Sequence, residues 1–278
     1  MVEKVNVDKA TVLSFGDEWS RFDQSNLEEK EQLRLFEAYF RIFPWEALPP
    51  NAEGFDMGCG SGRWAKLVLP KVGLLHCIDA SQDALAVAQR NIGSHPNVRF
   101  HHATTESSPL AAVSQDFGYS LGVLHHIPDT QAAMTACVRL LKQGAPFLVY
   151  LYYRFDNRPA WFRAIWRCSE ILRRFVSSLP AWAKRAVTDL IAITVYWPLA
   201  RASLLGERMG INMKNVPLYG YRNLSLYTMR TDSRDRFGTP LEARFTQEEI
   251  RDMMERAGLA NVIISSDAPY WCAVGTKR

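Results

Sequence analysis

The sequence lacks the usual marks of secreted, disulfide-stabilised or membrane-spanning proteins. Its five cysteines are widely scattered and form no CxxC pair, which argues against a disulfide framework and a zinc site. No stretch reaches the roughly 18 uncharged apolar residues of a membrane span. The closest, residues 186–200, is interrupted by Asp189 and Pro198. The charged N-terminus has no apolar signal region. We therefore expect a cytoplasmic protein.

Metal-binding patterns are also missing. The six histidines show neither HxH nor HExxH spacing, and no carboxylate cluster lies beside them. We therefore expect no metal in the site. What the chain does have is 278 residues with 47% hydrophobic composition, which is enough to bury a sizeable core.

Strand-like and helix-like segments alternate along most of the chain. Strands are expected near residues 53–59, 73–81, 97–105, 116–127 and 145–154, with helices expected between most of them and two more strands in 261–278. Ser81 is a plausible N-cap for one helix and Thr246 for the last. This β-α-β-α rhythm implies a parallel sheet with helices on both faces.

A glycine-rich turn follows the first expected strand. Gly58, Gly60 and Gly62 alternate after the acidic Asp56. A dinucleotide loop requires G-x-G-x-x-G, but Arg63 stands where its third glycine belongs. A carboxylate just before the loop would also oppose a pyrophosphate. The turn therefore favours a cationic or amine-bearing ligand.

A second acidic residue, Asp79, ends the next expected strand, 19 positions after Gly60. That location suits a ribose diol, whose two hydroxyls can donate to one carboxylate. Together the two acids call for an adenosine carrying an amine and a positive charge, which S-adenosylmethionine provides. The ordinary alternative is a tight glycine turn, with Asp79 capping the helix near Ser81.

These motifs resemble those of class I S-adenosylmethionine-dependent methyltransferases of the small-molecule type. The resemblance rests on "FDMGCGSGRWAKLV", "LHCIDAS", "DFGYSLGVLHHIPD" and "VRLLKQGAPFLVYLY", which agree in order and spacing across residues 50–152. It implies an α/β, Rossmann-like, doubly wound sheet of seven mostly parallel strands with an antiparallel last strand. Residues 154–240 fall outside it and form a helical insertion.

The predicted organisation has four parts. Residues 1–48 form an N-terminal helical segment and cofactor lid, and residues 49–153 form the S-adenosylmethionine-binding core. Residues 154–240 form a helical, basic and aromatic cap over the acceptor. Residues 241–278 supply a helix and the last two strands of the core.

The resemblance also implies cofactor-binding residues. They are Asp56, Gly58, Gly60, Gly62, Asp79, Ala80, Leu121 and Gly122. Thr104 and the adjacent Thr105 are further candidates, and Thr104 stands where the family often has an acidic residue. Segments like residues 15–24 often fold over the cofactor in similar enzymes, which makes Trp19 a candidate. The alternative for that segment is an amphipathic helix packed on the sheet.

Two adjacent histidines follow the fourth expected strand. His125 and His126 therefore lie at the mouth of the site in an open α/β sheet. Histidine has a suitable pKa for a general base near neutral pH. We favour His126, because an extended segment cannot point both rings inward. The alternative is that both only shape the loop, since alignment alone supplies much of the rate.

Residues 154–208 carry ten basic and four acidic side chains and four tryptophans. Three partners suit this composition: the inner face of an anionic membrane, a substrate bearing phosphate, carboxylate or a lipid tail, and, ranked lowest, nucleic acid. The ordinary alternative is a solvated basic face on a cap whose tryptophans form its core. A second copy of the chain, in a homodimer, is a further candidate partner.

The following segment, residues 217–237, is rich in aromatic residues and arginine. We expect Tyr219, Tyr221 and Tyr227 to line an acceptor pocket with Tyr153, and Arg222 to clamp an acid. The predicted activity is methyl transfer to a hydroxyl, with an amine second, of a small or lipid-linked metabolite such as a sugar or natural product. The alternatives are a catalytically silent S-adenosylmethionine-binding protein and, third, an RNA methyltransferase.

Overall fold

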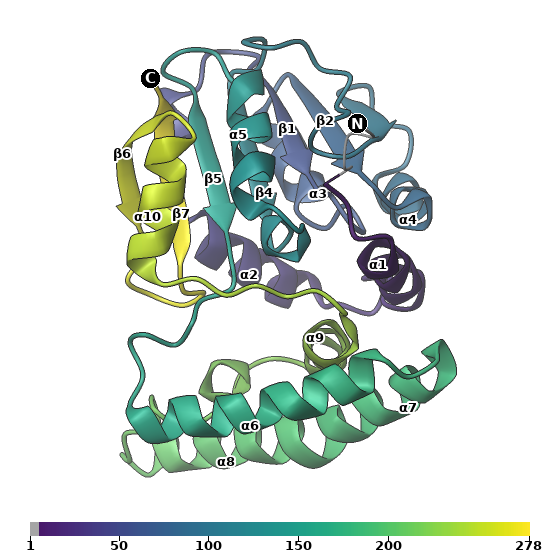
Figure 1. Cartoon of the computed structure of the whole chain (residues 1–278), viewed down its shortest axis with the longest axis vertical. Helices are drawn as coiled ribbons and strands as arrows, with labels where there is room; N and C mark the ends of the chain where they lie inside the picture. Colours follow the sequence, from purple (N-terminus) through teal and green to yellow (C-terminus); the bar gives the residue numbers. More distant parts are fainter. Residues whose placement is uncertain (1–5) are drawn as a thin grey trace, which may run out of the picture. The chain divides into compact units, whose positions relative to one another are not determined.

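The computed structural model describes residues 6–278 and contains a seven-stranded sheet with strand order β3-β2-β1-β4-β5-β7-β6 (Figure 1). The strands are β1 (Glu53–Met57), β2 (Leu74–Asp79), β3 (Val98–His102), β4 (Phe117–Leu121), β5 (Pro146–Tyr150), β6 (Leu259–Ile264) and β7 (Cys272–Lys277). The first five run parallel, and β7 runs antiparallel to β5 and to β6. The predicted fold class is confirmed.

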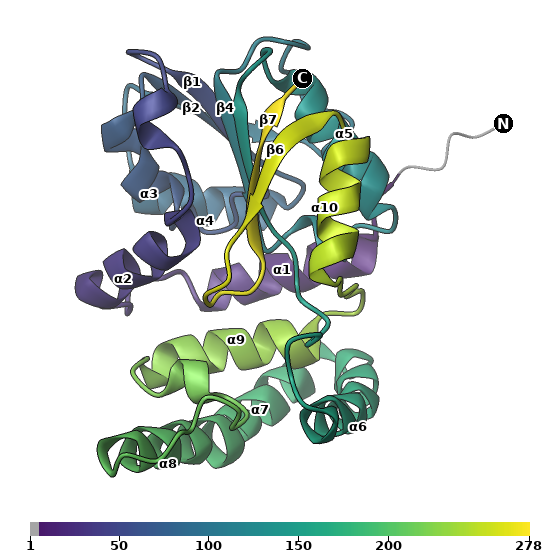
Figure 2. The ribbon, with the colours of Figure 1, turned by 90° about the vertical axis from the view of Figure 1, so that its left-hand side faces the viewer.

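Helices cover both faces of this sheet, as the edge-on view in Figure 2 shows for α3 on one side and α5 and α10 on the other. The helices around the sheet are α1 (Lys9–Arg21), α2 (Glu29–Phe40), α3 (Ala65–Val68), α4 (Gln82–Ile92), α5 (Thr130–Leu140) and α10 (Gln247–Arg256). Two cores result. One joins Phe55 and Met57 of β1 to α5 and α10, and the other joins Leu75 and Cys77 of β2 to α2, α3 and α4.

Local capping explains where two of these helices begin. The Ser81 side chain accepts a hydrogen bond from Ala84 N at the start of α4. Thr246 and Glu249 form a reciprocal capping box at the start of α10. Both starts agree with the sequence prediction. The helix expected between the first two strands, over residues 62–72, is much shorter in the structure. Helix α3 ends at Val68, because Pro70 lies in the 3-10 turn that follows it and cannot continue an α-helix.

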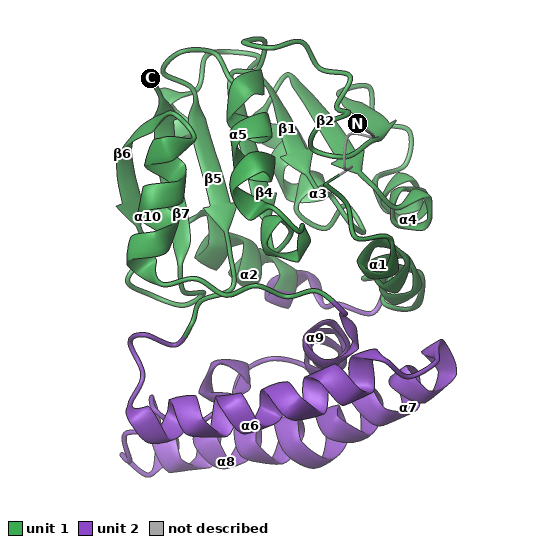
Figure 3. Cartoon of the chain, viewed as in Figure 1, with its two compact units in different colours: residues 1–24, 32–154, 241–278 green, residues 25–31, 155–240 purple. Residues whose placement is uncertain are grey.

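The chain divides into two compact units (Figure 3). The first takes in the described part of Met1–Gln24, Gln32–Arg154 and Leu241–Arg278, and the second takes in Ser25–Glu31 and Phe155–Pro240. The predicted cap, 154–240, differs from the second unit by one residue and by Ser25–Glu31. Most of the predicted N-terminal segment belongs to the sheet unit, and its residues 1–5 lie outside the described residues.

The second unit is helical. Its helices are α6 (Ala160–Ser177), α7 (Ala181–Ile191), α8 (Trp197–Arg208) and α9 (Leu226–Gly238), and a π-helical turn, Ala192–Tyr196, joins α7 to α8. Its small core consists of Val176, Tyr196, Ala200, Met229 and Phe237. Among residues 6–278, no helix is both long and apolar enough to cross a bilayer.

Two glycines allow β1 and β4 to carry large aromatic rings on neighbouring positions. Gly54 pairs with Phe117, and Phe55 pairs with Gly118. Each phenylalanine ring lies over the glycine of the other strand, so a methyl group at either glycine would overlap that ring. The absence of a side chain at these positions therefore allows both rings to pack in the interior.

We predict that Gly118→Ala lowers the free energy of unfolding by about 1–3 kcal/mol, the usual cost of overpacking a core. Urea unfolding would measure it. Gly220→Ala is the matched control, because no atom lies within 4 Å of a methyl group there. We expect the control to change stability by less than about 0.5 kcal/mol. Equal effects at the two glycines would contradict this packing argument.

Candidate functional site

The glycine turn lies at the carboxyl end of β1. Gly58, Gly60 and Gly62 have φ values of 80°, 54° and 75°, a region that favours glycine. The backbone N–H groups of Gly58 and Cys59 both donate to the Ile78 carbonyl, which ties the turn to β2. The chain is therefore held in a conformation that most other residues would strain.

Asp79 connects three elements at this edge of the sheet. Its Oδ2 accepts a hydrogen bond from Gly60 N at 2.9 Å, and its Oδ1 accepts one from Ser81 N at 2.8 Å. Burial raises the pKa of Asp79, and these two bonds oppose that rise. Ser81 is the N-cap of α4, and Asp79 holds the backbone of Ser81 at the start of that helix.

Asp56 is a buried carboxyl group, only 1% exposed. Burial raises its pKa to about 8, the nearby Asp79 adds to the rise, and the Tyr119 hydroxyl and Arg63 oppose it. Asp56 Oδ2 and the Tyr119 hydroxyl nevertheless lack a hydrogen bond of good geometry. A cationic group beside Asp56 would favour its ionised form.

Two more hydroxyls are buried near these elements without a partner. Ser61 Oγ, in the glycine turn, and Thr105 Oγ1, just beyond β3, make no hydrogen bond with the described residues. Buried polar atoms are normally paired, so such atoms indicate a missing ligand or water. Thr104 differs, because its hydroxyl already exchanges hydrogen bonds with Ser107. Of the two predicted threonines, Thr105 is thus the better donor to a ligand.

The N-terminal helix α1 brings Trp19 to the glycine turn. A methyl group at Gly60 would lie 2.9 Å from Trp19 Nε1, so the indole rests directly on the turn. The Arg63 guanidinium lies 5.6 Å from the Trp19 ring centroid and 4.3 Å from that of Trp64. Helix α1 also contacts the start of α4 through Gly16 and Ser81. The structure therefore places Trp19 beside the glycine turn.

The remaining predicted cofactor residues occupy the neighbouring strand ends. The Ala80 carbonyl accepts a hydrogen bond from His102 Nε2 at 3.0 Å. Leu121 is buried at the end of β4, and Gly122 follows with φ of 80°. A methyl group at Gly122 would come no closer than 4.0 Å to Tyr150, so the space beside this glycine is open.

His125 and His126 lie in a 3-10 turn, Leu124–His126, and both are buried. The expectation of an extended segment was wrong, and the two rings lie together with centroids 4.0 Å apart. His126 Nδ1 donates to the Leu241 carbonyl at 2.7 Å. Neither ring nitrogen of His125 has a partner among the described residues, and burial, with His126 and Arg244, holds its pKa well below the usual value.

Phe15, from the predicted segment 15–24, and three residues that the sequence analysis missed lie around these histidines. Tyr152 stacks on His125 at 3.9 Å between centroids, and Phe15 contacts the edge of His126 at 4.9 Å. Arg244 lies 5.1 Å from the Tyr152 centroid and forms an ion pair with the buried Glu242. Of the three missed residues, only Tyr152 carried a sequence signal, because it is one of two adjacent tyrosines that closely follow β5.

The predicted acceptor residues are divided between the two compact units. Tyr153, in the sheet unit, packs against Tyr270 and Trp271 rather than on the histidines. In the helical unit, Tyr221 contacts Tyr196 in the core, and the Tyr227 carbonyl accepts a hydrogen bond from Thr231.

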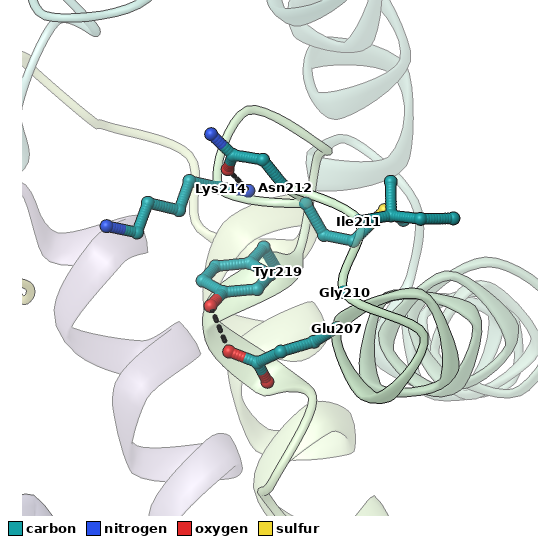
Figure 4. A pocket seen from close by; sticks show the side chains of 7 residues that line it. Glu207, Gly210, Ile211, Asn212, Lys214 and Tyr219 are labelled. Atoms are coloured by element: carbon teal, nitrogen blue, oxygen red, sulfur yellow. Dashed lines mark hydrogen bonds between the residues drawn. The ribbon is translucent and has the colours of Figure 1, made fainter.

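Tyr219 lines a pocket of about 330 Å³ in the helical unit (Figure 4). Its hydroxyl donates to Glu207 Oε1 at 2.6 Å, and Arg222 Nε donates to Glu207 Oε2 at 2.6 Å. The Arg222 guanidinium also lies 3.8 Å from the Tyr219 ring centroid. An acidic acceptor would therefore have to compete with Glu207 for the predicted clamp.

Comparison with known proteins agrees with this geometry. Residues 55–149 match a family model described as a methyltransferase domain. The chain is 29% identical to the ubiquinone biosynthesis O-methyltransferase of Pseudomonas fluorescens (strain Pf0-1), over 56% of this chain and 74% of that protein. These findings support the resemblance to class I S-adenosylmethionine-dependent methyltransferases that the sequence motifs carry.

Two further comparisons extend the match. The ubiquinone biosynthesis O-methyltransferase of Hahella chejuensis is 26% identical, over 74% of this chain and 93% of that protein. A solved S-adenosylmethionine-dependent methyltransferase from Thermotoga maritima has the same fold, with a TM-score of 0.50 and 16% identity, over 95% of this chain and 100% of that chain.

The methyltransferase-domain match supports S-adenosylmethionine as the cofactor. The residues around the glycine turn fit that molecule, because they combine a buried carboxyl group with unpaired hydroxyls. We expect Asp56 to hold the charged methionine end, Asp79 to hold the ribose hydroxyls, and Thr105 and Ala80 to border the adenine.

We predict that Asp79→Ala weakens S-adenosylmethionine binding by about ten- to a hundredfold, since hydrogen bonds to charged groups contribute about 1.5–3 kcal/mol. Calorimetric titration would measure the dissociation constant. Ser81→Ala is the control, because it removes the α4 cap and leaves the Asp79 carboxylate in place. Equal affinity in the Asp79 variant and the wild type would contradict the assignment.

We predict a pH-dependent gain of stability in Asp56→Asn. The pKa of Asp56 is raised from 3.8 to about 8 in the folded protein. The folded state therefore holds its proton more tightly, and Asp56 reduces the free energy of unfolding as pH rises from about 4 to about 8. Asparagine removes this dependence.

Thermal unfolding without cofactor at several pH values would test this expectation. Above pH 8 we expect the variant to be about 1–3 kcal/mol more stable, the cost of a buried group that is poorly paired. Near pH 4 the two proteins should be similar. Parallel stability curves across the whole range would contradict the predicted titration of Asp56.

Proposed function

We propose that this methyltransferase methylates a hydroxyl group of a small or lipid-linked metabolite, with His126 as the general base. The observation that carries the proposal is the hydrogen bond from His126 Nδ1 to the Leu241 carbonyl. A carbonyl only accepts, so Nδ1 carries the proton in this bond. In the neutral ring, Nε2 is then the basic nitrogen.

The surroundings of His126 support this role. The ring is 4% exposed and is held by Phe15 on one side and by His125 on another. A ring fixed in one tautomer and one orientation can take a proton without rearranging first. Because burial keeps His125 neutral, no second positive charge develops next to His126.

The proposed transfer needs a cofactor, an aligned acceptor and a base. S-adenosylmethionine, when bound, would supply a methyl group activated by its sulfonium. The chain would align the hydroxyl oxygen and exclude water. His126 Nε2 would take the hydroxyl proton as the oxygen is methylated. Removing this proton is what a hydroxyl acceptor requires of the protein.

The relatives support a hydroxyl rather than an amine. Both curated relatives are named O-methyltransferases of ubiquinone biosynthesis. The aromatic rings of Phe15, Tyr152 and the two histidines also suit a flat acceptor. We therefore propose a phenolic hydroxyl as the first class to test, ahead of sugars.

The test is transfer of a labelled methyl group to matched acceptors: catechols with and without a prenyl tail, the corresponding anilines, and simple sugars. We expect turnover with at least one catechol and little with its aniline analogue. Methylation of the amine in preference to the hydroxyl would overturn the proposal.

We predict that His126→Asn lowers kcat by about 10²–10⁴, the usual contribution of a general base. Asparagine can still donate to the Leu241 carbonyl, so the turn should keep its shape. Steady-state assays quenched at successive times would give kcat, and calorimetry would show that cofactor affinity is unchanged. An unchanged kcat would mean that the histidines only shape the loop.

A further inference from the structure

Arg63 directly follows the glycine turn and carries a charge that no described residue neutralises. The side chain is half-buried, and its guanidinium forms no ion pair or hydrogen bond with any residue from 6 to 278. By contrast, Arg41, Arg154 and Arg244 of the same compact unit each form an ion pair with a carboxylate. The guanidinium of Arg63 is therefore available to an anionic group of a ligand.

Two tryptophan rings hold this guanidinium. It lies 4.3 Å from the ring centroid of Trp64 and 5.6 Å from that of Trp19, in α1. Trp64 is itself fixed, because it is buried and packs against Tyr39 with the two ring centroids 4.9 Å apart. A cation–π contact uses no N–H donor, so the guanidinium is oriented while its five N–H groups remain able to donate.

The backbone of Arg63 is fixed as well. Gln32 Nε2, from α2, donates to the Arg63 carbonyl at 3.1 Å. The N–H group of the preceding Gly62 donates to the Cys59 carbonyl at 2.9 Å, which closes the end of the glycine turn. The side chain therefore extends from a rigid position, and it would lose little conformational freedom on binding a ligand.

The guanidinium lies close to the buried carboxyl group of Asp56. Burial raises the pKa of Asp56, and the charge of Arg63 opposes that rise. The guanidinium also lies beside the glycine turn, since the Trp19 ring that it contacts rests on Gly60. Arg63 and Asp56 thus provide one positive and one negative group at the same edge of the sheet.

The methionine end of S-adenosylmethionine also carries one charge of each sign. Its ammonium and carboxylate groups are bonded to the same carbon atom, so an ammonium group bound at Asp56 brings the carboxylate with it. Without a nearby cation, that carboxylate would be repelled by Asp56 and Asp79. An arginine can instead donate to both of its oxygens at once.

We propose that Arg63 binds the carboxylate of S-adenosylmethionine and thereby makes the site select cofactors that carry one. This inference rests on the cofactor of the proposed function and does not depend on which acceptor is methylated. S-adenosylhomocysteine keeps the carboxylate, so it should use the same contact. The ordinary alternative is that Arg63 only packs between the two indole rings.

The test compares S-adenosylmethionine with its decarboxylated form, which keeps the adenosine, the sulfonium and the amine. Calorimetric titration of the full-length protein gives both dissociation constants without any turnover. We expect the wild type to bind S-adenosylmethionine about ten- to a hundredfold more tightly, the usual effect of hydrogen bonds between charged groups. In Arg63→Gln, the affinity for S-adenosylmethionine should fall to that for the decarboxylated form, which should bind the variant and the wild type about equally.

Two further variants serve as controls. Lys71→Gln removes a cation that also lies over an indole, 5.4 Å from the Trp45 ring centroid, in the 3-10 turn after α3. It should leave both dissociation constants unchanged. Arg63→Lys keeps the charge but loses the planar donor pair, so it should keep only part of the preference for the carboxylate. Thermal unfolding should show that each variant folds.

The ratio of the two dissociation constants separates a carboxylate contact from a packing role. If Arg63 only packs the indole rings, Arg63→Gln weakens both ligands by the same factor, and the proposal is overturned. It is also overturned if the wild type binds the two ligands equally, or if Arg63→Gln binds S-adenosylmethionine as tightly as the wild type does. A wild type that binds neither ligand would overturn the cofactor assignment too, which distinguishes that failure from the failure of this proposal alone.

Discussion

The candidate cofactor site depends on the two backbone hydrogen bonds that the Asp79 carboxylate accepts. One fixes Gly60 in the turn after β1, and the other fixes Ser81 at the start of α4. A single side chain thus joins the turn, the end of β2 and a helix N-terminus. Because Asp79 is half-buried, these donors stabilise its charge. The turn itself needs glycine, since its φ values are positive at three positions.

The sheet could be predicted from the sequence because its signals are local. Most strands are short runs rich in apolar residues, and the starts of α4 and α10 are marked by Ser81 and Thr246, which cap the helices they precede. Helix α3 was predicted too long because Pro70 interrupts an otherwise helical pattern. The doubly wound arrangement with an antiparallel last strand was implied by a family resemblance, since an alternating pattern does not say which strands are neighbours.

The site was predictable only where its residues belong to compact motifs. Asp56, the glycines and Asp79 lie within 24 positions of one another, whereas Arg244 reaches Tyr152 from 92 positions away along the chain. No spacing pattern in the sequence predicts such a contact. The paired histidines show the opposite error. They were singled out from their place after β4, but a 3-10 turn places both rings in one cluster, which an assumed extended chain excluded.

The helical unit shows why composition alone was ambiguous. Tryptophans among arginines describe equally well a cap with an aromatic core and a cap with an aromatic surface. Periodicity shows that residues share a face, but not whether another element covers that face. The core instead consists of Val176, Tyr196, Ala200, Met229 and Phe237, so the tryptophans at 161, 182 and 197 are left on the outside. Exposed apolar area of this extent is unfavourable in water.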